Sequence, residues 1–344
     1  MVINEDKVRG ALFGQGIGDA LGLPAEFNSK SALLERMKVW DDEWPNKYRG
    51  VRRGSVEGWK AGDWTDDTEQ AVAILVAYLG SVDEGRDPAD SVELTKVAEK
   101  FMQWAIDDGR GMGHLTGQIL DNAMFCLMPQ VVAEDMWKAS GRRSAPNGAV
   151  MRTAPMGVLR PLDAAWTARE AAEVAKVTHF DPRCVASAVA VSVTISKLVT
   201  GSTIPEAIEA GIAAGREHHP EVEKFARMSL AELDLDEGME KGRGAPIGYT
   251  YKCMGSGFAA LREYWRQADE VPGFAFHDGV AQDLFKRTLT QIVMEGGDAD
   301  TNGAVAGAML GAFVGYSGIP DWMKDDLLGK NQMEGLYQRL LALR

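Results

Sequence analysis

The amino-acid sequence predicts an all-α fold. Apolar residues recur at helical spacing in many segments, whereas runs with the two-residue alternation of a half-buried strand are few. Glycines also recur at every fourth position in two stretches, Gly10 to Gly22 near the N-terminus and Gly303 to Gly315 near the C-terminus. Because a four-residue step keeps positions on nearly one face of a helix, we expect both stretches to be helical.

The glycine rows also predict how these two helices pack. A glycine inside a helix costs about 1 kcal/mol relative to alanine. A sequence that accepts this cost repeatedly is expected to need the close approach of another backbone. We therefore expect the two helices at the centre of the helical core and regard them as candidates for contact with each other. The rows alone predict packing and no chemistry.

Apolar periodicity predicts seven further helices between the two glycine rows. They are expected at residues 68–79, 92–105, 164–177, 184–198, 205–216, 257–265 and 279–295. Two stretches are expected to be loops: residues 36–63, which contain three tryptophans and several glycines, and residues 217–247, which are polar and end in a glycine-rich segment. Since neither resembles a flexible linker, we expect residues 1–344 to form a single domain.

Composition limits the classes of function. The 344 residues, 45% of them apolar, are enough for a large core. A net charge of −13 argues against non-specific binding to nucleic acid or anionic membrane, although a bound cation would still allow a phosphate-bearing small ligand. Three scattered cysteines (Cys126, Cys184 and Cys253) indicate a reduced, cytoplasmic protein. The N-terminus lacks the apolar core of a signal peptide, and the longest uncharged stretch, 302–320, is expected to be a buried helix.

Two short acidic clusters, more than two hundred positions apart, each open an apolar run. They are Thr65-Asp66-Asp67 and Asp298-Ala299-Asp300-Thr301. Four carboxylates and two hydroxyls brought together would repel one another without a cation, and oxygen-only ligands suit Mg²⁺ or Mn²⁺. Each cluster alone is as consistent with N-capping of the following helix. The occurrence of both in one chain favours a metal site.

Five sequence blocks resemble those of a known family. In chain order they are GALFGQGIGDALGLPAEF, GDWTDDT, NGAVMRTAPMG, Thr178-His179 and GGDADTNGAVAGAMLGAFVGYSGIPDW. Together they cover about residues 8–322 and resemble the ADP-ribosylglycohydrolase family, which includes the hydrolase that releases ADP-ribose from dinitrogen reductase. The resemblance implies a compact, orthogonal bundle of helices with a cleft that holds two Mg²⁺ or Mn²⁺ ions.

The resemblance also implies the residues of the metal centre. The expected ligands are Thr65, Asp66, Asp67, Asp298, Asp300 and Thr301. Two cations can hold vicinal ribose hydroxyls, orient a water and stabilise developing charge. Glu26, in the PAEF segment, is expected to bind a metal-linked water or to protonate the scissile bond, so Glu26, Asp67 and Asp298 are the expected catalytic residues. For Glu26 alone, a solvated carboxylate at a helix end is the alternative.

Family members use the block around residue 147 for the diphosphate and adjoining ribose of ADP-ribose. The substrate contacts implied here are Asn147, Gly148, Ala149 and Met151, with His179 and Tyr249 in addition. Gly148 permits close approach, and free backbone N–H groups can hold a diphosphate. Ordinary core positions are the alternative for His179 and Tyr249. Arg152 is expected to be structural and to pair with a buried carboxylate.

One position departs from the family pattern. Many arginine-specific relatives carry Asp in a D-x-G-x-x-T segment after a helix that contains tryptophan. Trp104 locates that helix here, and Gly111 occupies the Asp position. Asp107 or Asp108 would replace this carboxylate if the loop were shifted. The departure leaves open which residue is the general base and whether arginine is the modified side chain.

The leading hypothesis is a metal-dependent hydrolase that cleaves at C1″ of the distal ribose and releases ADP-ribose. The expected substrate is an ADP-ribosylated protein side chain, with arginine first. One alternative is a non-catalytic binder of ADP-ribose or of a modified partner, as in an immunity protein. Another is a hydrolase of a different N-glycosidic substrate. The acidic charge disfavours nucleic acid except as a modified terminus or base.

Overall fold

The computed structural model describes residues 2–40, 43–52, 58–233, 235, 246–270 and 278–344. Within these residues the regular structure consists of sixteen α-helices and two short 3₁₀-helices, and β-pairing is limited to isolated bridges. The predicted all-α class is confirmed.

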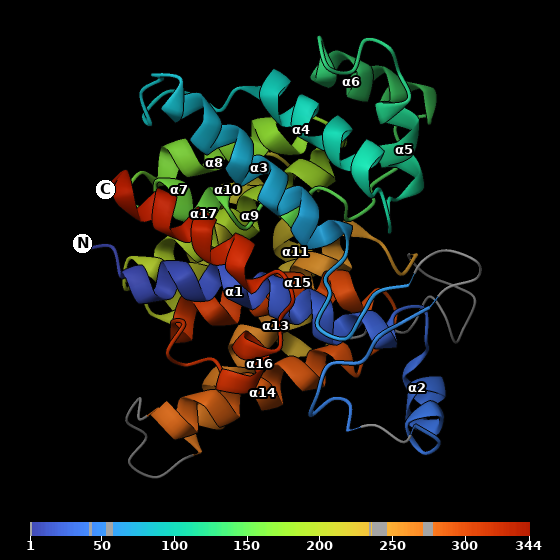
Figure 1. Ribbon diagram of the computed structural model, residues 1–344, viewed down its shortest axis with the longest axis vertical. Coiled ribbons are helices and arrows are strands. Elements are labelled where there is room, and N and C mark those ends of the chain that lie inside the picture. Colours follow the sequence, from blue (N-terminus) through green and yellow to red (C-terminus); the bar gives the residue numbers. More distant parts are fainter. Residues whose placement is uncertain (1, 41–42, 53–57, 234, 236–245, 271–277) are drawn as a thin grey trace.

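Two central helices, α1 (Glu5–Gly22) and α15 (Ala299–Val314), pack directly against each other (Figure 1). Their glycine rows face each other, and we call this contact the glycine seam. A Cβ atom added to Gly14 would lie 2.1 Å from the carbonyl oxygen of Gly307, and one added to Gly18 would lie 1.9 Å from that of Gly303. The two backbones are therefore in contact, as the sequence suggested.

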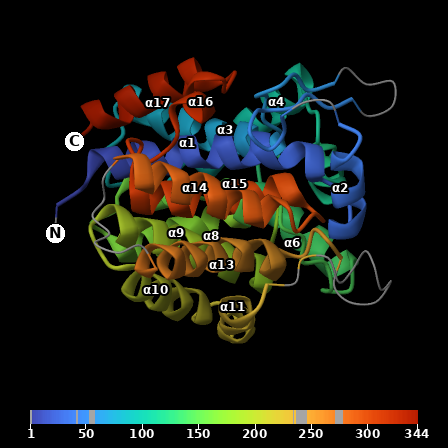
Figure 2. The same cartoon turned by 90° about the horizontal axis from the view of Figure 1, so that it is seen from below.

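The other helices lie in layers around this pair (Figure 2). On one side of α1 lie α16 (Asp321–Asp325) and α17 (Lys330–Ala342). On the other side α14 (Asp278–Val293) lies beside α15, and helices from the middle of the chain lie beyond it. These are α9 (Pro182–Val199), α10 (Ile204–Arg216), α11 (Glu221–Ala231) and α13 (Thr250–Asp269). The acidic cluster of Asp298 and Asp300 stands at the start of α15, beside this central contact.

A third group of elements covers one edge of the bundle. Helices α3 (Asp66–Asp83), α4 (Leu94–Asp107) and α8 (Ala164–Ala175) were predicted. The short elements were not: α2 (Lys30–Met37), α5 (His114–Leu120), α6 (Pro129–Ala139), α7 (Met156–Leu159), η1 (Leu23–Ala25) and η2 (Val150–Arg152). They span 3 to 11 residues, which is no longer than the shortest window in which helical periodicity is recognised, about 11 residues.

Two apolar helices are core elements. Among the described residues, α9 is the one helix long and apolar enough to cross a membrane, but 83% of it is buried inside the protein, where it packs against α8, α10, α13 and α15. The uncharged stretch 302–320 begins inside α15, whose residues Ala299 to Phe313 are all buried. The expectation of a buried helix is confirmed for residues 302–314, whereas residues 315–320 lie beyond the end of α15 at Val314.

The two predicted loops had different outcomes. Residues 217–247 were expected to lack structure, but α11 lies within them because Val222 and Ala226, one turn apart, bury one face of it. Residues 234 and 236–245 of that stretch lie outside the described part. The described residues of 36–63 form no helix after α2 ends at Met37, and one antiparallel bridge joins Val51 to Trp59. Of these, residues 41–42 and 53–57 lie outside the described part.

Candidate functional site

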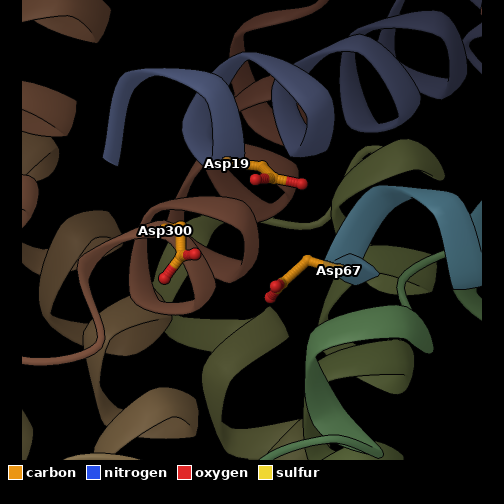
Figure 3. Close-up of side chains that lie close together, drawn as sticks. All are labelled: Asp19, Asp67 and Asp300. Atoms are coloured by element: carbon orange, nitrogen blue, oxygen red, sulfur yellow. The ribbon is translucent and has the colours of Figure 1, made fainter. Parts of the chain in front are cut away.

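Helices α1, α3 and α15 bring three buried carboxylates together (Figure 3). Asp19 comes from α1, Asp67 from the first turn of α3 and Asp300 from the first turn of α15. One oxygen of each lies within 4.8 Å of the other two. Glu26, Asp298 and Asp300 form a second group that meets the same limit. The two acidic clusters of the sequence therefore converge.

Helix capping does not account for these acidic residues. Thr65 and Asp298 occupy the N-cap positions of α3 and α15, but neither side chain makes a capping hydrogen bond. Oxygen Oδ1 of Asp67 is buried and accepts no hydrogen bond from the described residues. A buried acceptor left in this way is unfavourable unless another group satisfies it.

The electrostatics of the cluster favour a bound cation. Burial, followed by repulsion from Asp300, raises the pKa of Asp19 to about 8. Burial and the neighbouring carboxylates also raise the pKa of Asp66 and of Asp67 well above its ordinary value. Because each negative charge here opposes the others, a positive charge among them would stabilise the ionised forms.

The spacing of the oxygen atoms also fits a hard divalent ion. Thr65 Oγ1 lies 3.0 Å from Asp67 Oδ2. Adjacent ligands of an octahedral Mg²⁺ with bonds of about 2.1 Å are about 3 Å apart. The donor set, which is made of carboxylate and hydroxyl oxygens, therefore fits Mg²⁺ or Mn²⁺.

Two residues of this region were missed in the sequence. Asp19 is fully buried and accepts hydrogen bonds from the backbone N–H and the hydroxyl of both Thr65 and Thr68. The available signal was a lone aspartate among the glycines and apolar residues of a helix, because a fully buried aspartate needs partners. Gln70, which donates to Asp66 Oδ2 at 3.3 Å, gave no such signal.

Arg152 is structural, as predicted, but its partners differ from the expected carboxylate. Its guanidinium is fully buried and donates to Gln70 Oε1 and to Thr178 Oγ1, both at 2.7 Å. Arg152 is linked to Asp66 in two ways: Gln70, which accepts from Arg152, donates to Asp66, and the two charges attract each other. Burial lowers the pKa of Arg152 to about 9, and Asp66 opposes that shift.

The same arginine and His179 share the Thr178 hydroxyl. Thr178 Oγ1 accepts from Arg152 and lies 2.7 Å from His179 Nδ1. Burial and the charge of Arg152 hold the pKa of His179 well below its ordinary value, so the ring is neutral. The second ring nitrogen, Nε2, lies beside Gly148. A Cβ on Gly148 would lie 2.8 Å from this nitrogen, so the missing side chain leaves it room.

These residues line a cavity of about 410 Å³. The predicted site residues in its wall are Glu26, Asp66, Asp67, Asn147, Gly148, Met151, His179, Asp298, Asp300 and Thr301. Thr65 lies behind them and contacts Asp67, while Ala149 is fully buried outside the wall. Tyr249 lines a neighbouring cavity of about 680 Å³, where its ring packs edge-on against Phe225 and Tyr251. His179 is thus both buried and part of the cavity wall.

Gly111, at the position of the family aspartate, packs against Asp66, a predicted metal ligand. Gly111 has a φ of 85°, and a Cβ added to it would lie 2.4 Å from Asp66 Oδ1. Asp107 and Asp108 do not take over its role. Asp107 accepts from Gln103, Asp108 pairs with Arg110, and both lie outside the cavity wall.

Known proteins that are similar to this chain match it over nearly its whole length. The family model described as ADP-ribosylglycohydrolase matches residues 2–344. The chain is 25% identical to the ADP-ribosyl-(dinitrogen reductase) glycohydrolase of Rhodospirillum rubrum, over 98% of this chain and 96% of that protein. It is also 25% identical to the ADP-ribosylarginine hydrolase Tri1 of Serratia proteamaculans, over 98% and 80%. A solved structure titled ADP-ribosylglycohydrolase-related protein complex shares the fold, with a TM-score of 0.66, 23% identity and coverage of 99% and 98%.

Proposed function

Since this chain belongs to the ADP-ribosylglycohydrolase family, we propose that it uses two divalent cations, Mg²⁺ or Mn²⁺, to release ADP-ribose from an ADP-ribosylated protein side chain. Arginine is the first choice, because relatives named for ADP-ribosylarginine and for modified dinitrogen reductase match the chain. The proposal extends to a single functional domain of residues 1–344. It also includes a cytoplasmic location, which the three unpaired cysteines support.

One observation carries the proposal: carboxylates from distant parts of the chain converge in the wall of one cavity, and Asp67 keeps a buried oxygen without a hydrogen-bond donor from the described residues. We assign the cations to Thr65, Asp66, Asp67, Asp298, Asp300 and Thr301. When bound, such ions hold vicinal hydroxyls and lower the pKa of a coordinated water. Asn147 donates to Asp298 Oδ2 at 2.7 Å and so orients that carboxylate.

Glu26 is the residue proposed to move the proton. Its carboxylate belongs to the group with Asp298 and Asp300 and lines the cavity. Cleavage of a bond at C1″ passes through an oxocarbenium-like state, in which the leaving group must be protonated and the developing positive charge stabilised. As the bond at C1″ breaks, Glu26 would give its proton to the leaving group, and the carboxylates beside it would stabilise the positive charge on the sugar. A water molecule would then add to C1″ and give a proton back to Glu26, so that ADP-ribose is released and the acid is restored.

The other part of the cavity wall is suited to the phosphate and ribose groups. His179 presents Nε2 beside Gly148, whose missing side chain leaves room for a ligand against the backbone. Met151 and Asn147 complete this part of the wall. A neutral imidazole and the exposed backbone at a glycine can form hydrogen bonds with the oxygen atoms of phosphate and ribose groups.

A substrate panel tests the proposal. Arginine-, serine- and nucleic-acid-linked ADP-ribose would be offered with Mg²⁺, with Mn²⁺ and with a chelator, and ADP-ribose release would be measured. Asp298→Ala and Asp66→Ala should each abolish release together with the thermal stabilisation by metal. Asp135→Ala, at an exposed carboxylate, should change neither.

Two results would contradict the proposal. Full activity of Asp298→Ala would remove the metal assignment. Binding of ADP-ribose in calorimetry without release from any substrate would instead favour the non-catalytic binder. That alternative is tested because Gly111 stands where many arginine-specific relatives carry an aspartate. Release from a nucleoside or a modified base alone would favour the other N-glycosidic hydrolase.

A further inference from the structure

The carboxylate of Asp19 is fully used by hydrogen bonds. Oδ1 accepts from the N–H of Thr65 at 3.0 Å and from its hydroxyl at 2.9 Å. Oδ2 accepts from the N–H of Thr65 and of Thr68, both at 3.1 Å, and from the hydroxyl of Thr68 at 2.6 Å. Four donors occupy about four lone-pair positions. When both hydroxyls are directed at Asp19, its oxygen close to Asp67 and Asp300 keeps no lone pair for a cation.

The hydroxyl of Thr65 has two acceptors within reach and one proton. Asp19 Oδ1 lies at 2.9 Å and Asp67 Oδ2 at 3.0 Å. A proton directed at Asp67 would lie between two proposed metal ligands and repel a cation there. A proton directed at Asp19 leaves lone pairs on Thr65 Oγ1 and Asp67 Oδ2 facing the same position.

The backbone on both sides of Asp19 is fixed by the glycine seam. A Cβ on Gly18 would strike the carbonyl oxygen of Gly303, and one on Gly22 would lie 2.1 Å from that of Ala299. Asp19 therefore extends from a backbone that touches α15 to the first turn of α3. Its carboxylate accepts the first-turn N–H groups of α3, which the N-cap side chain of that helix does not satisfy.

From these contacts we propose that Asp19 is a positioning residue of the metal centre. It takes the hydroxyl proton of Thr65, so that this oxygen binds the cation through a lone pair, and it holds the start of α3 in register with α15. This inference rests on the proposed function for the existence of the cation. It is independent of which ADP-ribosyl linkage is cleaved.

The test measures Mn²⁺ affinity by calorimetry on the full chain. Asp19→Asn keeps the shape of the side chain but places an NH₂ group against N–H and O–H donors. We expect Mn²⁺ affinity to fall by about 10- to 100-fold, as is usual when a partner of a metal ligand is removed. Glu170→Gln is the matched control, because Glu170 is also buried and accepts a backbone N–H, from Val92, but lies outside the cavity wall. Its affinity should equal that of the wild type.

A double-mutant cycle with Thr65→Val separates positioning from direct ligation. If Asp19 acts through the Thr65 hydroxyl, Asp19→Asn should have a much smaller effect in the Thr65→Val background. Additive losses, or wild-type affinity of Asp19→Asn, would overturn the inference. If Asp19→Asn does not fold, Thr68→Val removes one of the four donors to Asp19, a hydroxyl whose hydrogen bond goes to Asp19 and not to a proposed ligand, and it should lower affinity several-fold.

Failure of this inference is distinguishable from failure of the proposed function. A wild-type protein that binds Mn²⁺ but releases no ADP-ribose would contradict the proposed function and leave the role of Asp19 intact. Unchanged Mn²⁺ affinity of Asp19→Asn in a protein that does release ADP-ribose would contradict the role of Asp19 alone.

Discussion

Replacing a glycine of the seam by alanine should separate α1 from α15. In Gly18→Ala the new Cβ would lie 1.9 Å from the carbonyl oxygen of Gly303, whereas real Cβ atoms keep at least 3.0 Å from such atoms. The helices would have to move apart by about 1 Å at that point. The obstacle is backbone on both sides, so no side chain can rotate away to relieve the contact.

The size of the effect follows from two opposing terms. Alanine gains about 1 kcal/mol over glycine in helix propensity. Overpacking of a close-packed contact costs about 1–3 kcal/mol and sometimes more. The upper end applies here, because the neighbouring pairs Gly14 with Gly307 and Gly22 with Ala299 hold the same close separation. We expect a net loss of about 2 kcal/mol in the free energy of unfolding.

Urea denaturation of three variants checks the reasoning. Gly80→Ala lies in α3 with no atom within 4 Å of the added Cβ, so it should gain up to about 1 kcal/mol. Gly10→Ala would meet Gly311 at 2.3 Å and should lose stability without changing Mn²⁺ affinity, because it lies at the other end of the seam from Asp19. Gly18→Ala should lower both the free energy of unfolding and the affinity for Mn²⁺. Wild-type stability of Gly18→Ala, or an equal loss in Gly80→Ala, would refute the argument.

Three further outcomes are expected. Arg152→Leu leaves two buried acceptors without their donor and should lower the free energy of unfolding by about 3 kcal/mol in urea titration; a loss below about 1 kcal/mol would contradict this. Gly111→Ala would place a Cβ 2.4 Å from Asp66 Oδ1 at a positive φ and should weaken Mn²⁺ binding in calorimetry, whereas Gly113→Ala, with open space around it, should not. With a chelator present, the raised pKa values of Asp66 and Asp19 mean that the folded protein keeps protons which the unfolded chain releases near pH 3.8. These groups therefore stabilise the fold at low pH. Their contribution is lost as the pH rises, toward about 8 for Asp19. The thermal midpoint should therefore fall over this range in chelator and fall less, or rise, in saturating Mn²⁺; a midpoint with the same pH dependence in both would count against a cation among these carboxylates.

The sequence allowed the central packing to be predicted because its cause is local. A glycine at every fourth position is unfavourable in an isolated helix, so its presence implies a neighbouring backbone. The convergence of Asp67 with Asp300 was predictable for a similar reason, since uncompensated acidic groups at two helix starts imply a shared partner. In both cases the pattern carried an energetic cost that another part of the molecule had to offset.

Other parts of the site depend on contacts that no local pattern encodes. The partners of Asp19 are 46 and 49 positions away, and nothing in α1 alone shows which donors its carboxylate meets. The hydrogen bonds from Arg152 to Gln70 and Thr178 likewise join three separate elements. Helix α11 was not predicted because it is mostly polar and only two of its residues, Val222 and Ala226, are buried.

The distance along the chain between Asp19 and Asp300 has a consequence during synthesis. A ribosome makes α1 long before α15, and N-terminal segments usually begin to fold while the rest is still being translated. During that interval the glycine face of α1 lacks α15, and the carboxylates of Asp19 and Asp67 lack Asp300. Newly made chains would therefore have no complete carboxylate cluster until α15 emerges, and fragments that end before α15 would never form it.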